Sequence, residues 1–306
     1  MSGASMAGFS QGAVERGLVG SMLITGGLML LEAVGGLLTG SLALLSDAWH
    51  MLSDFLSLVL CFTAGRMARR DADVGKTFGY GRVEVLSALA NGFALLIIAA
   101  FIFYEAFERF VSPIEVRTVE MLIIAAVGLV GNLVSMGFIS GGVGSLNVKA
   151  AFLHVMGDAL SSIGVIAAGL VMHFTGFYFA DPAMSIVIGS IITFSSLRML
   201  REVVHVLLEG TPRHIDLEEV TRALEGVEGV AEVHDLHVWS TASWMHFLTA
   251  HIVVKKEHLA DAEVVMNNVK EMLALRFRLA HTTLQIEAEG YKEIGQVHRL
   301  KNHKRG

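Results

Sequence analysis

The sequence predicts a membrane domain of six helices followed by a small α+β domain. Of its 306 residues, 53% are hydrophobic and only 17% are charged. Long apolar stretches fill residues 18–205, whereas charged residues concentrate after Glu209. After Glu209 the apolar residues recur with the short periods of amphipathic helices and half-buried strands, which is typical of a folded soluble domain.

Six stretches have the length and composition of membrane spans. A helix needs about 20 mostly apolar residues to cross the hydrocarbon core of a bilayer. The sequence predicts spans near residues 18–39, 42–66, 84–106, 117–139, 149–173 and 183–205. The first span follows a short leader without a convincing cleavage site, so we expect a retained helix and not a signal peptide.

Basic residues in the loops predict the orientation of these spans. Most of them lie between spans two and three, before span five or at the end of span six, namely Arg66, Arg69, Arg70, Lys76, Arg82, Lys149, Arg198 and Arg201. The opposite side carries only Arg109 and Arg117. We therefore expect both termini to be cytoplasmic. The single cysteine, Cys61, excludes an intrachain disulfide.

Five elements are predicted after the last span. Residues 215–226 and 259–277 have helical periodicity, and Val230–Ser240, Phe247–Lys255 and Thr282–Ala288 alternate like strands. An αββαβ order favours a small α+β sheet covered by helices on one face. The expected domains are a six-helix transmembrane domain over residues 1–208, a cytoplasmic αββαβ domain over 209–290 and a basic C-terminal tail over 291–306.

A histidine and an aspartate stand four residues apart in two of the predicted spans. His50 and Asp54 lie in the second span, and His154 and Asp158 lie in the fifth. Residues i and i+4 share one face of an α-helix. Ionisable groups in hydrocarbon are costly, so they normally face the bundle interior and mark an ion path. Two such helices would present two imidazoles and two carboxylates to one metal ion, and the alternative is a proton relay without metal.

The ligand types indicate which metal this site would take. Mixed nitrogen and oxygen ligands in tetrahedral geometry suit zinc, and cadmium or cobalt could use the same set. Magnesium and calcium favour oxygen-rich sites of higher coordination number. Because imidazole binds metal only when unprotonated, loading releases protons, and the same residues could couple metal movement to a proton gradient.

Other polar residues of the spans have structural interpretations. Four are interpreted as contacts between helices, namely Glu32, Asp47, Asn91 and Asn132. The alternatives are that Glu32, Asn91 and Asn132 bind water and that Asp47 orients a ligand of the metal. Asp181 followed by Pro182 predicts the start of a helix, with the aspartate as its N-cap and the proline at the first helical position.

A second group of candidate ligands lies in the soluble region. Residues 234–239 (HDLHVW) fall on the first predicted strand, and strict alternation would place His234 and His237 on opposite faces of the sheet. His251 lies on the hairpin partner, within reach of His234 across the strands. Glu287 ends the third strand. We predict a second metal site from His234, His251 and Glu287; the alternative is that these are ordinary surface residues in a chain with 13 histidines.

Together these residues resemble the cation diffusion facilitator family of zinc-exporting metal/proton antiporters. The resemblance covers nearly the whole chain and is closest over residues 41–50 (SLALLSDAWH), 78–84 (FGYGRVE), 145–150 (SLNVKA) and 234–239 (HDLHVW). It implies that the four residues in the spans are the transport ligands. It also implies a metallochaperone-like domain that dimerises in the cytoplasm, with metal at His234, His251 and a position near Glu287.

The chain departs from the family pattern in two loops. Some members carry a further metal site between spans two and three, made by an aspartate and two histidines. Here Lys76 and Tyr80 stand where those histidines would fall, and only Asp73 remains, so we do not predict that site. The histidine-rich loop of many eukaryotic members is also missing, because Ile139–Lys149 is short and glycine-rich. This favours a bacterial plasma-membrane protein.

The sequence therefore predicts a homodimeric secondary transporter. It would export zinc, and also cadmium or cobalt, in exchange for protons by alternating access, with zinc as transported and regulatory ion, no other cofactor and no nucleic-acid partner. One alternative is a membrane metal sensor. The other is an intramembrane metallohydrolase, which needs an open coordination position and a general base, as in His-Glu-x-x-His. That motif does not occur in the sequence.

Overall fold

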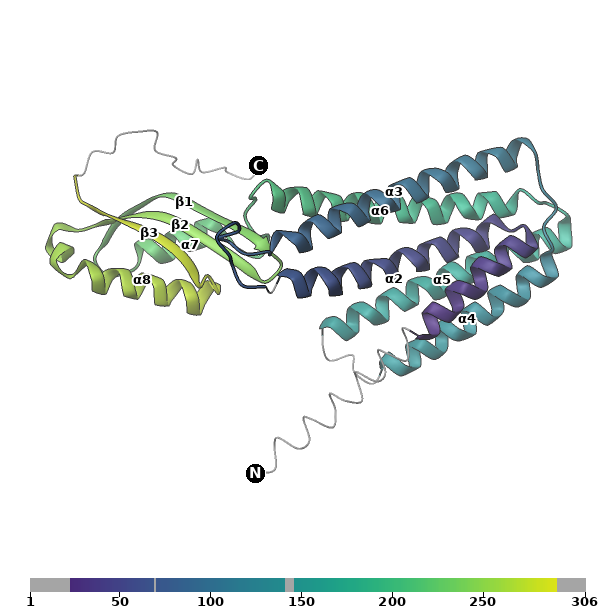
Figure 1. Cartoon of the computed structure of the whole chain (residues 1–306), viewed down its shortest axis with the longest axis horizontal. Helices are drawn as coiled ribbons and strands as arrows, with labels where there is room; N and C mark the ends of the chain where they lie inside the picture. The colour runs from purple at the N-terminus through teal and green to yellow at the C-terminus, as the bar shows by residue number, and fades with distance from the viewer. Residues whose placement is uncertain (1–22, 69, 141–145, 291–306) are drawn as a thin grey trace, which may run out of the picture. The chain divides into compact units, whose positions relative to one another are not determined.

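The computed structural model describes residues 23–68, 70–140 and 146–290 (Figure 1). The predicted basic tail over residues 291–306 lies outside the described residues. The contacts divide the chain into two compact units, one made of Met1–Leu60 and Ala90–Met199 and the other of Cys61–Leu89 and Leu200–Gly306. The second unit thus joins the loop after α2 with the C-terminal region.

The first unit is made of long helices, and the ends of three of them, α2, α3 and α6, belong to the second unit. An apolar helix over Leu23–Thr39 comes first. It is followed by α2 Leu42–Ala68, α3 Arg82–Val111, α4 Thr118–Ser140, α5 Leu146–Thr175 and α6 Ala180–Leu207 (Figure 1). Among the described residues, four helices are long and apolar enough to cross a membrane, namely α3 to α6. A membrane-embedded domain is therefore supported, and the count of six spans stays a prediction.

Apolar side chains fill the interior of the first unit and also cover its outside. Leu44 of α2, Ile102 of α3 and Ile192 of α6 belong to one buried cluster. Large apolar residues also point outward, among them Phe101 of α3 and Phe194 of α6, which are 57% and 72% exposed. Such a surface would promote aggregation in water, and it is the surface expected of helices in contact with lipid.

Asp181 connects helices that are distant in sequence. Its carboxylate accepts hydrogen bonds from the backbone N–H groups of Leu42 (2.7 Å) and Ala43 (3.1 Å) and from the Ser41 hydroxyl (2.6 Å). The Arg109 guanidinium lies 3.2 Å from the same carboxylate. Asp181 therefore caps the N-terminus of α2. The prediction that it caps its own helix is wrong, because α6 already begins at Ala180.

The second unit contains a three-stranded sheet and two helices in the predicted αββαβ order. These are α7 Leu217–Glu225, β1 Val230–Ala242, β2 Met245–Val254, the short 3₁₀ helix η1 Lys256–Asp261, α8 Ala262–Phe277 and β3 His281–Ala288. β2 is central, with β1 antiparallel on one side and β3 parallel on the other. Asp216 caps α7 by accepting hydrogen bonds from Glu218 N and Glu219 N.

Both helices cover the same face of the sheet, as predicted. Leu224 of α7 and Leu273 of α8 pack with Leu248 and Ile252 of β2 in one buried cluster. Gly229 lies in the turn between α7 and β1 with φ +90°, and a Cβ there would lie 2.7 Å from Val265 Cγ2. Only glycine satisfies both the backbone conformation and the close approach. The face away from the helices is the one that carries the candidate ligands.

Candidate metal sites

A β-bulge in β1 decides which side chains face away from the helices. His234 pairs with His251, but His237 pairs with Thr249, so β1 holds one extra residue between these pairs. Asp235 takes up the insertion with φ +47°. The bulge places His234 and His237 on the same face. The prediction of opposite faces is wrong, because strict alternation does not allow for an inserted residue.

Three of the predicted ligands come together from three strands. The ligand atoms of His234, His251 and Glu287 all lie within 4.8 Å of one another. His251 Nδ1 is 2.8 Å from Glu287 Oε1, and His234 Nε2 is 3.4 Å from Glu287 Oε2. The parallel register aligns Glu287 with Val253, two residues after His251 on the same face. Two imidazoles and a carboxylate fit zinc, and the assignment of metal to them stays a prediction.

The charge and burial of this group favour a cation. The Glu287 side chain is only 5% exposed, and the His234 side chain 9%. The side-chain amide of Gln285 donates a hydrogen bond to Glu287 Oε1 at 2.8 Å, which orients the carboxylate. A buried carboxylate costs free energy unless a positive charge or hydrogen bonds balance it. The group is thus arranged to hold a divalent cation or to share a proton with an imidazole.

The predicted ligands in the spans are described only in part. Both His-x-x-x-Asp pairs lie within α-helices, one in α2 and one in α5. His50 is half-buried, and Asp158 is buried at 2% exposure. The side chains of Asp54 and His154 lie outside the described part of the structure. The shared intramembrane site therefore stays a prediction.

Hydrogen bonds tie α2, α4 and α5 together beside these pairs. The Ser161 hydroxyl of α5 donates to Asp47 Oδ1 of α2 at 2.6 Å. The Asn132 amide of α4 donates to Ser162 Oγ of α5 at 3.4 Å. These contacts have the interhelical character predicted for Asp47 and Asn132. Ser161 was missed, because a single serine in an apolar span gives no signal of its partner.

Glu32 is a second acidic side chain in the interior of this unit. It is fully buried in the helix Leu23–Thr39, and among the described residues neither of its carboxyl oxygens has a hydrogen-bond partner. Gly128 of α4 makes room for it, because a Cβ there would lie within van der Waals overlap of Glu32 Oε1. A buried carboxyl without a hydrogen-bond partner in the described part of the chain marks this part of the unit as polar.

In the loop between α2 and α3, hydrogen bonds already engage the Asp73 carboxylate. It accepts them from the Tyr80 hydroxyl (2.6 Å) and from the backbone N–H groups of Gly75 (2.8 Å) and Lys76 (2.9 Å). The Tyr80 hydrogen bond, followed by the backbone ones, lowers the pKa of Asp73. Asp73 thus organises a tight turn.

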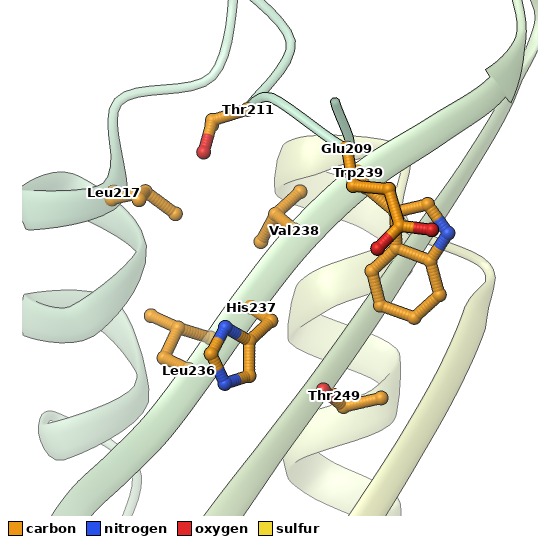
Figure 2. A pocket seen from close by; sticks show the side chains of 8 residues that line it. All are labelled: Glu209, Thr211, Leu217, Leu236, His237, Val238, Trp239 and Thr249. Atoms are coloured by element: carbon orange, nitrogen blue, oxygen red, sulfur yellow. The ribbon is translucent and has the colours of Figure 1, made fainter. Parts of the chain in front are cut away.

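A pocket of about 470 Å³ lies along β1 (Figure 2). Its lining comes from the segment before α7, from the start of α7 and from the strands, namely Glu209, Thr211, Leu217, Leu236, His237, Val238, Trp239 and Thr249. None of the three clustered ligands lines it. The pocket is therefore separate from the candidate metal group.

Comparison with known proteins agrees with this arrangement of a membrane domain followed by a domain that carries a candidate metal group. The family model described as the cation efflux transmembrane domain matches residues 18–208, and that described as the cytoplasmic domain of cation efflux proteins matches residues 212–289. These two matches identify the class of the protein as a membrane cation transporter. The chain belongs to the cation efflux family, the cation diffusion facilitators, which confirms the predicted family and the predicted class of transporter.

Three relatives that are named as metal transporters match the chain over most of their length. The cadmium, cobalt and zinc/H(+)-K(+) antiporter of Bacillus subtilis (strain 168) is 41% identical over 94% of this chain and 94% of that protein. The metal cation efflux system protein CzcD of Cupriavidus metallidurans is 40% identical over 90% and 87%. The zinc transporter ZitB of Pectobacterium atrosepticum is 37% identical over 88% and 84%.

Proposed function

We propose that this protein exports zinc from the cytoplasm in exchange for protons, with cadmium and cobalt as further substrates. The observation that carries the proposal is the duplicated His-x-x-x-Asp sequence in α2 and α5, in a chain whose relatives are named for transport of these three metals. His50, Asp54, His154 and Asp158 form the transport site in this proposal. Four protein ligands leave no coordination position for a catalytic water, so the site suits binding and release.

Proton coupling follows from the chemistry of the ligands. An imidazole must lose its proton to bind metal, and a protonated imidazole or carboxyl releases it. Metal would enter from the cytoplasm, and protons arriving from the other side would displace it. The Ser161–Asp47 hydrogen bond would hold α2 and α5 together next to the ligands during this exchange. Alternating access of a six-span bundle, with both termini cytoplasmic in a bacterial plasma membrane, completes the proposal.

The C-terminal domain would act as a regulatory metal site in a homodimer. The match of residues 212–289 to the cytoplasmic domain of cation efflux proteins supports its place in the cytoplasm. Zinc held by His234, His251 and Glu287 would link three strands. Because only the folded arrangement offers all three ligands, bound zinc would stabilise that arrangement by mass action.

Removal of one transport ligand tests this function. Asp54→Ala and Asp158→Ala each leave three ligands, and we expect zinc flux into proteoliposomes to fall by at least about tenfold, since even weaker changes near a metal site cost that much. The control Asp216→Ala removes an exposed N-cap outside the spans and should leave flux within about twofold, because it costs only about 1 kcal/mol of stability. Near-normal flux in a well-folded Asp158→Ala variant would contradict the proposed site.

A further inference from the structure

A second histidine pair lies in the second unit, away from the candidate metal group. His214 precedes α7 and His246 is near the start of β2. Their ring centroids are 5.0 Å apart and their planes are inclined by 59°. The corresponding values for His234 and His251 are 5.1 Å and 63°. The two pairs therefore have nearly the same mutual geometry, although only one of them was predicted from the sequence.

The hairpin fixes the orientation of the His246 ring. Ser240 and His246 are partners in the β1–β2 register, and Ser240 Oγ lies 2.8 Å from His246 Nδ1. Metal-binding histidines are commonly held in this way through the ring nitrogen that does not bind the metal. Because Nδ1 is engaged by the hydroxyl, Nε2 is the nitrogen that His246 can offer to an ion.

Oxygen ligands are available in the same pocket. His214 and His246 line a pocket of about 360 Å³ together with Glu84, Glu202 and His205. Glu202 is paired with Arg213 at 3.4 Å, and both side chains are about half exposed or more. Exposed ion pairs are weak, so Glu202 can leave Arg213 for a metal. Among the described residues, three ligand atoms already lie together only at His234, His251 and Glu287, so the second site needs a carboxylate rotation or water to complete it.

We propose that His214 and His246 form a second divalent-metal site within the second unit, completed by a carboxylate of Glu202 of α6 or Glu84 of α3 and by water. Two nitrogens with one carboxylate select zinc or a metal of similar ligand preference. With only two residues in place, this site binds more weakly than the group at Glu287. It binds metal whether or not the protein transports, so its test does not depend on the proposed function.

Residue-resolved protection of histidines by zinc tests the proposal. Purified full-length protein, freed of metal, is modified with diethyl pyrocarbonate at increasing zinc, and each histidine is quantified by mass spectrometry. We expect zinc to protect His214 and His246 in the wild type and equally in the double variant His234→Ala with His251→Ala. Ser240→Ala should raise the zinc concentration for half-protection of His214 by about tenfold, the usual effect of losing an orienting contact.

Two outcomes decide the question. In His246→Gln the zinc-dependent protection of His214 should disappear, whereas in the control His258→Gln, on η1 outside the pocket, it should persist. Protection of His214 that survives in His246→Gln, or no protection of either residue at saturating zinc, would overturn the site. Because each variant is compared with itself without zinc, a mere stacking contact between the rings would not produce the expected result.

Discussion

Glu287 adds a carboxylate to the imidazoles of His234 and His251 and so gives the candidate metal group of the C-terminal domain a third ligand. Its two carboxylate oxygens reach His251 and His234 separately, at 2.8 and 3.4 Å, and its side chain is almost fully buried. A buried carboxylate between two imidazoles supplies the negative charge that a divalent ion needs. At the residue scale, the same combination of nitrogen and oxygen ligands is predicted in the spans at His50 and Asp158.

Exchanging one of these ligands should change the choice of metal. His50→Asp replaces a nitrogen ligand by an oxygen, which favours harder ions such as manganese. We expect the ratio of zinc to manganese uptake, measured in competition in proteoliposomes, to fall by about tenfold, or about 1.4 kcal/mol of selectivity. Asp216→Ala serves again as the control, with an unchanged ratio. If the ratio in His50→Asp equals that of the wild type, His50 does not contact the transported ion.

At the scale of elements, the start of α2 depends on a residue of α6. Asp181 satisfies two N–H groups of the first turn of α2 and pairs with Arg109 of α3. It is 1% exposed, so water cannot replace these contacts. α2 carries His50 and Asp54, and the position of its first turn therefore fixes where the helix presents them.

Removal of this carboxylate should destabilise the protein strongly. Asp181→Ala leaves the N–H groups of Leu42 and Ala43 without their acceptor and takes one of two carboxylates from Arg109, which keeps Glu105 at 3.2 Å. The cost should be about 3 kcal/mol, at the lower end of the range typical of a broken buried ion pair. The matched exposed cap, Asp216→Ala, should cost only about 1 kcal/mol. Thermal denaturation of the detergent-solubilised protein compares the two melting temperatures, with a clearly larger drop expected for Asp181→Ala. Equal drops would show that the Asp181 contacts contribute no more than an exposed cap.

Local patterns predicted the elements better than they predicted the contacts between them. Alternation and helical periodicity were sufficient for the αββαβ order, because each period depends on neighbouring residues. The bulge at Asp235 could not be predicted, since one inserted residue changes the face of His237 without changing the composition of the strand. Asp181 was assigned to its own helix for a similar reason, because capping signals are local and its partners lie about 140 residues earlier.

On the scale of the whole molecule, the two predicted metal sites would have different roles. The pairs in α2 and α5 would bind the ion that moves, whereas His234, His251 and Glu287 would respond to zinc in the cytoplasm. The sequence indicated both groups, because repeated ligand spacing in the spans and histidines on paired strands are visible along the chain. His214 and His246 could not be found in this way, since their approach requires the folded hairpin.

The central claim is that the protein exchanges divalent metal for protons. Zinc uptake driven by a pH gradient tests it most directly. Full-length protein is reconstituted in liposomes with an acidic lumen, and zinc outside and lumenal pH are followed by fluorescent indicators. We predict that zinc enters faster with an acidic lumen than without a gradient and that its entry makes the lumen more alkaline. A protonophore should abolish the difference. Zinc entry at the same rate with and without the gradient, and no change in lumenal pH, would contradict the claim.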